Sequence, residues 1–410
     1  MKIAYLTGEY PRATDTFIQR EVAGLRDLGL TVETCTIRRT GAAHLVGEEQ
    51  RQAAAETFAV LPATLNALRL TRAKLAALRY PGRFFRALAL AWRTAPKGIK
   101  GRAYNLIYFA EALVLADHMR RTRVTHLHNH IAKASCTVAM LASALSGIPY
   151  SFTLHGPDIF FAPEHWRLDE KIARARFVAC ISDFCRAQAM LWSAPAHWGK
   201  LKIVHCGVEP ARYTAGDRDG TRLVFVGRLA SVKGIAVLLE AFVDVLAARP
   251  DLTLTLVGDG PERAALEAEA ARLGVAGTVR FAGYQSQAEV ADLLASHDAL
   301  VLPSFAEGVP VVLMEALAAG LPVIATAVGG VGELVKDGET GCLIAPGDAA
   351  ALCDAILRMF GDAAMRARMG AAGRARIEAG FTARDEAARL ATLFQAGADL
   401  PQAKRPEAAT

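Results

Sequence analysis

Two glutamates, Glu307 and Glu315, stand with seven residues between them in a stretch that begins at Ser304 and reads SFAEGVPVVLMEALAAGLPVIAT. Glu307 lies in a turn rich in proline and glycine, and Glu315 lies in an apolar segment that ends at Gly320, as a helix does. Glutamates at this spacing are ordinarily solvated charges, but the apolar and glycine-rich surroundings favour binding. Carboxylates accept hydrogen bonds from vicinal hydroxyls, and a helix start suits a diphosphate. The pair therefore predicts one carboxylate at each end of a nucleotide-sugar.

Two cations, Arg228 and Lys233, follow the apolar run Leu223–Val226, which has the length of a buried strand. Glycines flank them, and we expect a helix to begin at Ile235. Arginine offers a planar fork of donors, lysine offers a point charge, and the helix start adds its dipole. A leaving diphosphate gains charge in the transition state, so both cations are expected to act mainly on rate.

A histidine, His155, follows the strand-like run Tyr150–Leu154 and precedes a Gly-Pro turn. A lone histidine is most often structural. Side chains at the carboxyl end of a parallel strand project into the ligand crevice, however, and this favours a functional role. Asp158 either belongs to the same site or caps the next helix.

Three further histidines, His126, His128 and His130, alternate along the strand-like run Val124–His130 and therefore share one face of it. This arrangement invites a zinc site, but no carboxylate or cysteine ligand lies nearby in the sequence, so we assign no metal. We expect the strand end to line a cleft, with His128 and His130 near an acceptor.

Apolar runs of strand length alternate with helical segments, which predicts an α/β fold. Lys2–Thr7, Phe17–Gly29 and Thr31–Ile37 form an opening strand, helix and strand, and the 410 residues suffice for two domains. We place a first domain at residues 1–205, a linker at 206–220, a second domain at 221–378, a returning helix at 379–395 and a disordered tail at 396–410.

Four motifs carry a resemblance to a known family. The stretch from Ser304 reads S-x-x-E-G-x-P-x-x-x-x-E-A-x-A-x-G-x-P-V-I-A-T and resembles the donor-binding signature of the retaining glycosyltransferases of family four. The motifs G-R-L-x-x-x-K-G from Gly227 and H-G-x-D from His155 resemble two more of that family's signatures. The pattern P-x-x-x-[DE]-T-F-x-x-x-E from Pro11 resembles a subgroup associated with exopolysaccharide assembly, which includes the colanic-acid-type enzymes.

The resemblance implies a GT-B-like fold, in which two Rossmann-like doubly wound domains face a central cleft. The donor is expected mostly on the second domain and the acceptor mostly on the first. Glu307 is expected to hold the transferred sugar and Glu315 the ribose, with Gly329, Gly330 and Glu333 closing the donor site. The implied catalytic residues are His155, Arg228, Lys233 and Glu307. The implied donor-binding residues are Gly227, Gly283, Tyr284, Gly308, Val309, Pro310 and Glu315. The implied acceptor-side residues are Asp15, Thr16, His128, His130 and Asp158.

The family also implies a reaction: sugar transfer with retention of anomeric configuration, without a metal or other cofactor. The expected donor is a nucleotide-diphosphate sugar, with UDP or GDP as the nucleotide. The expected acceptor is a glycan or a polyprenyl-diphosphate-linked oligosaccharide of exopolysaccharide or cell-envelope polysaccharide biosynthesis. A D-x-D triplet at residues 217–219 lies in the linker, and we assign it no metal.

Composition favours a cytoplasmic globular protein. Over half of the residues are apolar, and the seven cysteines are odd in number and show no paired zinc spacing, which indicates reduced thiols. No apolar run approaches the roughly 18 residues of a spanning helix, and the N-terminus is unlike a signal peptide.

The net charge of +6 is unevenly distributed. Residues 57–110 hold ten basic residues and no acid, so the remainder of the chain carries −4 (6 minus 10). A helix is expected over Thr64–Tyr80 with Arg69, Arg72 and Arg79 on one stripe, and aromatic residues follow it. Basic residues interleaved with aromatics suit an anionic leaflet, so we expect peripheral docking on the inner face of the plasma membrane; a solvated helical face is the alternative. No nucleic-acid motif accompanies the charge.

Other function classes remain open. A nucleotide-sugar epimerase of the same fold would need no acceptor, and a non-catalytic sugar-nucleotide-binding protein would tolerate loss of Glu307 and His155. A dehydrogenase is disfavoured, because the G-x-G at Gly258 is too short for a dinucleotide fingerprint.

Overall fold

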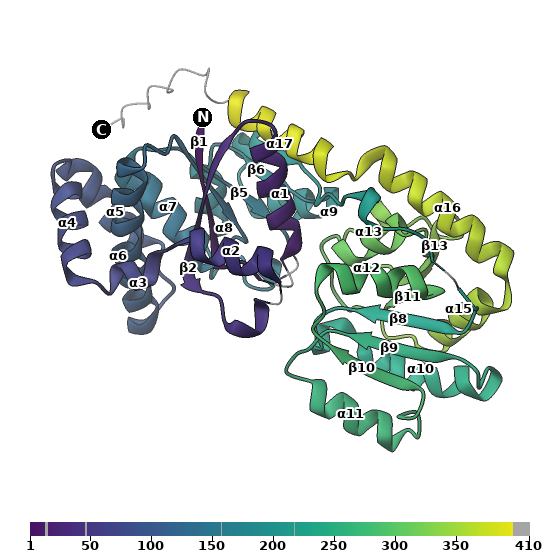
Figure 1. Cartoon of the computed structure of the whole chain (residues 1–410). Coiled ribbons are helices and arrows are strands. Elements are labelled where there is room, and N and C mark those ends of the chain that lie inside the picture. The colour runs from purple at the N-terminus through teal and green to yellow at the C-terminus, as the bar shows by residue number, and fades with distance from the viewer. Residues whose placement is uncertain (13–14, 46, 157, 217, 397–410) are drawn as a thin grey trace.

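Two parallel sheets organise the computed structural model, which describes residues 1–12, 15–45, 47–156, 158–216 and 218–396 (Figure 1). The first sheet has the strand order β3-β2-β1-β4-β5-β6-β7 and the second has β10-β9-β8-β11-β12-β13. The order reverses beside β1 and beside β8, and in such doubly wound sheets ligands bind at the carboxyl ends of the strands near the reversal. The predicted α/β class with two Rossmann-like sheets is confirmed.

The strands are short and mostly buried, and β4 and β5 bury all five of their residues, as parallel strands covered by helices do. The first sheet contains β1 (Lys2–Tyr10), β2 (Thr31–Arg39), β3 (Phe58–Ala59), β4 (His126–His130), β5 (Tyr150–Leu154), β6 (Val178–Cys180) and β7 (Leu201–Ile203). The second contains β8 (Arg222–Val226), β9 (Thr253–Val257), β10 (Val279–Gly283), β11 (Ala299–Leu302), β12 (Val323–Thr326) and β13 (Gly341–Ile344).

The first half of the chain has nine α-helices among its described residues. They are α1 (Thr16–Asp27), α2 (Glu48–Glu56), α3 (Val60–Thr64), α4 (Ala67–Leu78), α5 (Pro81–Arg93), α6 (Ile99–Arg121), α7 (Ala134–Ser146), α8 (Leu168–Arg174) and α9 (Asp183–Leu191). Short 3-10 turns are η1 (Ala42–His44), η2 (Asp158–Phe161), η3 (Pro195–Lys200) and η4 (Pro210–Arg212). Helix α7 ends at Gly147, whose φ of +80° lies in the left-handed region that favours glycine.

The helix expected over Thr64–Tyr80 is present with shorter bounds, as α4 (Ala67–Leu78). Helix α3 ends at Thr64, and the side chain of Asn66 accepts the N–H of Arg69 at 3.0 Å to start α4. An N-cap of this kind begins a new helix and so separates α4 from α3. Helices α4, α5 and α6 stand at the outer side of the first sheet (Figure 1). Within the described residues, no helix combines the length and apolarity needed to cross a bilayer.

The second half carries η5 (Ser231–Lys233), α10 (Ile235–Ala248), α11 (Arg263–Arg272), α12 (Gln287–Ser296), α13 (Val311–Ala318), α14 (Val331–Leu334), α15 (Ala349–Gly361), α16 (Ala363–Gly380) and α17 (Ala383–Ala396). Helix α17 returns to the first half and lies along α1 (Figure 1), where Leu390 and Phe394 share a buried cluster with Ile18. The domain boundaries within 205–221 and at 378/379 stay predictions. Residues 397–410 of the expected tail lie outside the described residues.

Candidate active site

Glu307 lies in the turn between β11 and α13, and two donors hold one of its oxygens. Lys233 Nζ lies 2.5 Å from Glu307 Oε1, and Ser304 Oγ donates to the same oxygen at 2.6 Å. The other oxygen, Oε2, has no hydrogen-bond partner among the described residues. The carboxylate can therefore accept a hydrogen bond from a ligand hydroxyl while it stays ion-paired.

Arg228 and Lys233 lie in the loop after β8, which packs directly against the Glu307 turn. Gly234 has a φ of +64°, and a Cβ there would lie 2.1 Å from the carbonyl oxygen of Pro303, so the loop requires glycine. The Arg228 side chain is exposed and makes no hydrogen bond or ion pair with any described residue. One cation is thus held by a carboxylate, and the other is available to an anion.

Glu315, on α13, is bound by the first half of the chain. Its Oε1 accepts a hydrogen bond from the Arg20 guanidinium of α1, and the same Nη2 lies 3.0 Å from the Tyr213 hydroxyl. Burial disfavours the charge of Arg20, but Glu315 together with Tyr213 and Glu209 outweighs this effect, so the pKa of Arg20 is raised. Arg20 Nε and Nη1 are buried without a partner among the described residues. Glu315 therefore links the two halves in this structure, and ribose binding by it stays a prediction.

The turn Gly308-Val309-Pro310 is buried and touches the first half of the chain. A Cβ at Gly308 would lie 2.1 Å from the carbonyl oxygen of His155, so only glycine permits this approach. From behind, Gly330 donates its N–H to the Gly308 carbonyl at 2.8 Å. The carboxyl edges of the two sheets therefore meet at this turn, one residue from Glu307.

Glu333, which is expected to help close the donor site, contacts the first half of the chain. Its carboxylate accepts the backbone N–H groups of Asp183 and Phe184, each at 2.8 Å. These N–H groups begin α9, where a carboxylate is stabilised by unpaired donors and the helix dipole. Glu333 thus links the two halves, and its part in closing the donor site stays a prediction.

His155 ends a chain of hydrogen bonds that starts at Glu21 on α1. Glu21 Oε1 accepts from the Tyr5 hydroxyl at 2.5 Å and from His130 Nε2 at 3.0 Å, and His130 Nδ1 lies 2.9 Å from His155 Nε2. A carboxylate only accepts, so a neutral His130 donates from Nε2 and accepts at Nδ1 from His155. His155 Nδ1 is then an acceptor, and its neighbour is the Cys206 thiol, with Sγ 3.7 Å away. A thiol is a weak donor that a sugar hydroxyl can displace.

The environment of His155 keeps its ring neutral. Burial, followed by the neighbouring His130, holds the pKa of His155 well below its usual range. The ring also packs 4.8 Å from that of Phe17, which fixes its orientation. His155 is thus positioned as a hydrogen-bonding group and not as a charge.

His128 does not reach the cleft, which corrects its expected acceptor-side role. The ring is fully buried, and its nitrogens lie 2.8 Å from Ser151 Oγ and 2.9 Å from Thr153 Oγ1. The rings of Phe177 and Phe394 pack against it at 6.1 and 5.3 Å. Three histidines do share one strand face, but helix α17 covers the part of that face that holds His128.

Metal-ligand geometry occurs in the same region. Glu21, His128 and His130 each bring one ligand atom within 4.8 Å of the others. The histidine nitrogens all have the hydrogen-bond partners given above, so we assign no ion to this cluster. In the linker triplet, Asp217 lies outside the described residues, and Asp219 is bound by neighbouring residues of its own loop.

The remaining expected residues lie around the same two edges. Asp15 and Thr16 begin α1, and the side chain of Asp158 lies outside the described residues. Gly283 ends β10 with a φ of +71°, and the ring of the adjacent Tyr284 lies 5.6 Å from that of His44 in the first half. Their contacts with donor or acceptor stay predictions.

Sequence reasoning missed Arg20, Glu21, Ser304 and Tyr213 as site residues. Glu21 carries a usable signal, because it follows Phe17 by four residues and so shares a helix face with a ring that points to the strand ends. Arg20 carries none, since its partner Glu315 is 295 residues away.

Two family models match the chain. One is described as "Glycosyl transferases group 1" and covers residues 214–376, and the other is described as "Glycosyltransferase Family 4" and covers residues 71–212. Both describe glycosyl transfer, which favours that activity over the epimerase and non-catalytic alternatives.

Curated relatives fall into two groups. A D-inositol 3-phosphate glycosyltransferase of Streptomyces avermitilis is 35% identical over 220 residues, which are 48% of this chain and 47% of that protein. The chain therefore spans about half the length of the first relatives it matches. The amylovoran biosynthesis glycosyltransferase AmsK of Erwinia amylovora is 26% identical over 391 residues, 88% of this chain and 90% of that one. The putative colanic acid biosynthesis glycosyltransferase WcaL of Salmonella typhimurium is 26% identical over 377 residues, 86% and 89% of the two chains. The expected likeness to exopolysaccharide enzymes is confirmed.

Among solved structures, HepE of Anabaena in complex with UDP and glucose superposes with a TM-score of 0.72 at 19% identity, covering 97% of this chain and 100% of that one. At an identity this low, the superposition establishes a shared fold and nothing further. The predicted GT-B-like architecture is confirmed.

Proposed function

We propose, from the chain's membership of the group 1 glycosyltransferases, that it transfers a sugar from a nucleotide-diphosphate donor to a glycan acceptor in exopolysaccharide or cell-envelope polysaccharide biosynthesis. Its likeness over most of its length to AmsK and WcaL supports the polysaccharide role.

The Glu307–Lys233 pair carries the proposal. The Glu307 carboxylate is paired with Lys233 and keeps one oxygen without a partner among the described residues, in the turn before α13 where Gly308 approaches the backbone of His155. We assign the diphosphate to Arg228, Lys233 and the N-terminus of α13, and the hydroxyls of the transferred sugar to Glu307 Oε2. Arg228 would bind the diphosphate first, because Lys233 is already paired.

Transfer would proceed with retention of configuration. The bond from the anomeric carbon to the diphosphate breaks, and a bond to the acceptor oxygen forms on the same face. The acceptor proton passes to the departing diphosphate oxygen, whose developing charge Lys233 and Arg228 stabilise. Neutral His155 would accept a hydrogen bond from the sugar at Nδ1. No step in this scheme requires a metal.

The donor is tested by calorimetry with UDP-, GDP- and ADP-sugars. UDP is the first candidate, because HepE of the same fold is known in complex with it. We expect one of them to bind and Arg228→Ala to weaken it about tenfold, as loss of a charged hydrogen bond does. Equal binding to both proteins would overturn the donor assignment.

The acceptor is proposed to be lipid-linked, and the protein to dock on the inner face of the membrane. Helices α4 and α5 expose Leu68 (84%), Leu75 (62%) and Phe85 (61%) beside basic residues, a surface that suits an anionic leaflet. Arg72 is less available, because it is paired with Asp117 at 2.7 Å.

Vesicle flotation on phosphatidylglycerol-containing liposomes tests this docking. Arg69→Glu with Arg79→Glu should reduce the floated fraction several-fold, since each basic residue near the surface contributes about 1 kcal/mol. The matched control, Lys336→Glu with Arg384→Glu, reverses two exposed charges outside the segment. Equal flotation of both variants and the parent would reject docking through α4.

A further inference from the structure

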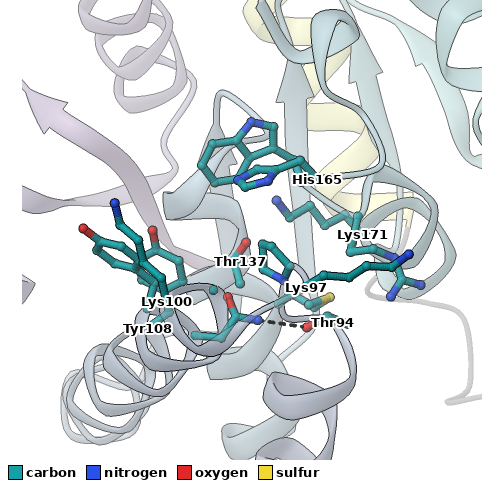
Figure 2. Close-up of a pocket in the computed structure, with 14 residues that line it drawn as sticks. Thr94, Lys97, Lys100, Tyr108, Thr137, His165 and Lys171 are labelled. Atoms are coloured by element: carbon teal, nitrogen blue, oxygen red, sulfur yellow. Dashed lines mark hydrogen bonds between the residues drawn. The ribbon is translucent and has the colours of Figure 1, made fainter.

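A cavity of about 650 Å³ lies on the first half of the chain, away from the residues assigned above (Figure 2). Helices α6, α7 and α8, the segment after α5 and the loop before α8 form its wall. Its lining residues are Thr94, Pro96, Lys97, Lys100, Gly101, Tyr104, Asn105, Tyr108, Thr137, Met140, His165, Trp166, Arg167 and Lys171. None of them is acidic.

Topology places the cavity at the ligand-binding edge of the first sheet. Helix α7 follows β4, so its first turns, which include Thr137, lie beyond the carboxyl end of that strand. Helix α6 precedes β4 and runs back along the sheet, so its first turns, with Lys100 and Tyr104, lie at the same edge. His130 is the last residue of β4, and His155 directly follows β5, so both lie at this edge of the sheet. The cavity and the candidate active site therefore share the carboxyl edge of the first sheet.

The cavity presents positive charge that nothing in the described structure neutralises. Lys97 and Lys100 are exposed and make no hydrogen bond or ion pair with a described residue. Lys171 lies beneath them, fully buried, with Nζ donating to the carbonyls of Ala132 and Lys133 at 2.8 and 2.9 Å. Burial lowers the pKa of Lys171 to about 8. An anion beside it would stabilise its charged form.

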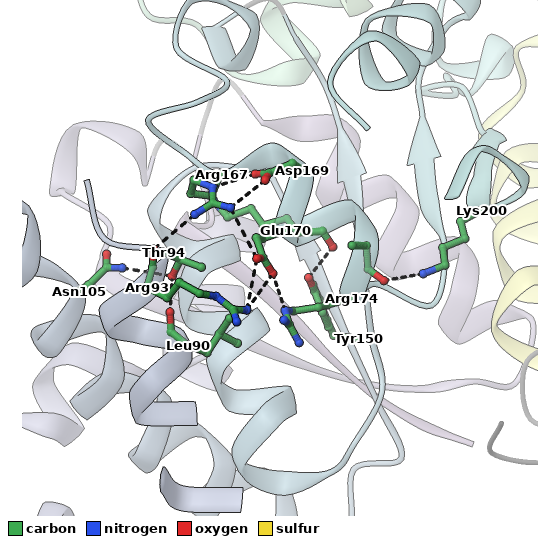
Figure 3. A network of polar contacts seen from close by, with 12 residues as sticks. Leu90, Arg93, Thr94, Asn105, Tyr150, Arg167, Asp169, Glu170, Arg174 and Lys200 are labelled. Carbon is green, nitrogen blue, oxygen red and sulfur yellow. Dashed lines mark hydrogen bonds and ion pairs between the residues drawn. The ribbon is translucent and has the colours of Figure 1, made fainter. Parts of the chain in front are cut away.

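Ion pairs beside the cavity hold its wall in place and add no unpaired charge to it (Figure 3). Arg167 pairs with Asp169 at 2.8 Å, and Glu170 lies 2.9 Å from Arg174 and 3.2 Å from Arg93. Because these acids are paired with arginines, Lys97 and Lys100 remain cations without an acidic partner among the described residues.

Aromatic rings line two sides of the space. Tyr104 and Tyr108 stack on α6 with centroids 6.4 Å apart, and His165 and Trp166 meet edge to face at 4.8 Å on the opposite loop. Rigid ring faces offer packing area to the apolar face of a sugar, and hydroxyl tips offer it hydrogen bonds.

Helix α6 also exposes apolar side chains that do not line the cavity. Ile99 is 89% exposed, Ile107 48% and Leu106 42%. An exposed apolar surface on the helix that carries Lys100 suits a phosphate carried by a lipid more than a phosphate free in solution.

We propose that this cavity binds the diphosphate-bearing end of a lipid-linked acceptor, with Lys97 and Lys100 on the diphosphate, the aromatic rings on the first sugar and the lipid on the exposed apolar surface of α6. This inference rests on the proposed function, because it supplies the acceptor for that transfer. The growing end of the glycan would then reach along the shared sheet edge to His155.

The test is calorimetric titration with farnesyl diphosphate and, separately, with UDP. Lys97→Ala with Lys100→Ala should weaken farnesyl diphosphate binding about tenfold and leave UDP binding unchanged. Arg121→Ala with Lys202→Ala removes two exposed cations outside both the cavity and the docking surface and should change neither. Both lysines are exposed, so the double variant is expected to fold, and its Tm checks this.

Three results would overturn the inference. Farnesyl diphosphate fails to bind, or Lys97→Ala with Lys100→Ala binds it as the parent does, or inorganic pyrophosphate binds as tightly and so removes the lipid preference. If Arg228→Ala abolishes farnesyl diphosphate binding and the lysine variant does not, the probe occupies the donor site and the inference is lost while the proposed function stands. If the lysine variant weakens the probe but no nucleotide-sugar binds, the cavity assignment stands and the proposed function fails.

Discussion

The two halves of the chain present the same edge of the same kind of sheet, but they build it from different chemistry. The second half uses charge: Lys233 is paired with Glu307, and the Arg228 side chain has no partner among the described residues. The first half uses imidazole rings: His155 and His130 form a hydrogen-bond chain anchored on Glu21. Since the strand order is equivalent, the side chains at the strand ends and not the fold decide what each edge can do.

This difference suggests a division of labour. Charge develops on the leaving diphosphate, so cations are useful where that group departs. A neutral ring can orient a sugar hydroxyl without attracting the diphosphate away from those cations. This difference can be tested in either half, by removing a charge from the second half or by changing the Glu21 carboxylate that anchors the histidines of the first half.

The largest expected effect comes from Lys233→Ala. This change removes a cation beside the leaving group and leaves Glu307 with Ser304 as its remaining donor. We expect kcat to fall about a hundredfold or more, as the loss of one transition-state contact often does. Steady-state assays with the nucleotide-sugar that binds in the calorimetric screen measure it, and Lys336→Ala, at an exposed lysine of the same half, is the control. Turnover near that of the parent would remove Lys233 from the diphosphate site.

A smaller effect is expected from Glu21→Gln in the first half. The amide is a weaker acceptor than a carboxylate, so it holds the proton position of His130, and through it that of His155, less firmly. We expect kcat to fall about tenfold with little change in the KM for the donor, because the donor's charged contacts lie in the other half.

The control for that change is Glu49→Gln, which makes the same substitution at an exposed glutamate on α2. If Glu21→Gln raised the donor KM and left kcat unchanged, Glu21 would act on binding, and the neutral chain would not be a positioning device.

Many of the helices and strands could be predicted from the sequence, because hydrophobic runs and the glycines that end helices are features of a few neighbouring residues. Strand Tyr150–Leu154 appears in the structure with its predicted bounds. The motif glycines also proved informative, since Gly308 and Gly234 are needed where backbone meets backbone. A local pattern does not show which residue from a distant part of the chain will contact a given side chain.

One error and one omission have that origin. Period-two alternation places His128 on the same face as His130, but only the arrival of Phe394, from the far end of the chain, decides that His128 is covered. The pairing of Glu315 with Arg20 was missed, because the two residues lie 295 positions apart in the chain.

The smallest effect tests the covered part of this histidine face at His126. Burial lowers the pKa of His126 from 6.5 to about 3. Below pH about 6.5 the unfolded chain therefore binds a proton that the folded chain does not, so the free energy of unfolding falls as the pH drops towards about 3. His126→Phe keeps a ring beside Phe177 and Phe394, whose centroids lie 5.9 and 5.1 Å from it, and removes this proton. Denaturant unfolding between about pH 6 and pH 4 should show the slope reduced by about 1 kcal/mol per pH unit. An unchanged slope would mean that His126 titrates alike in both states, whereas His165→Phe, at an exposed ring, should leave the slope as it is.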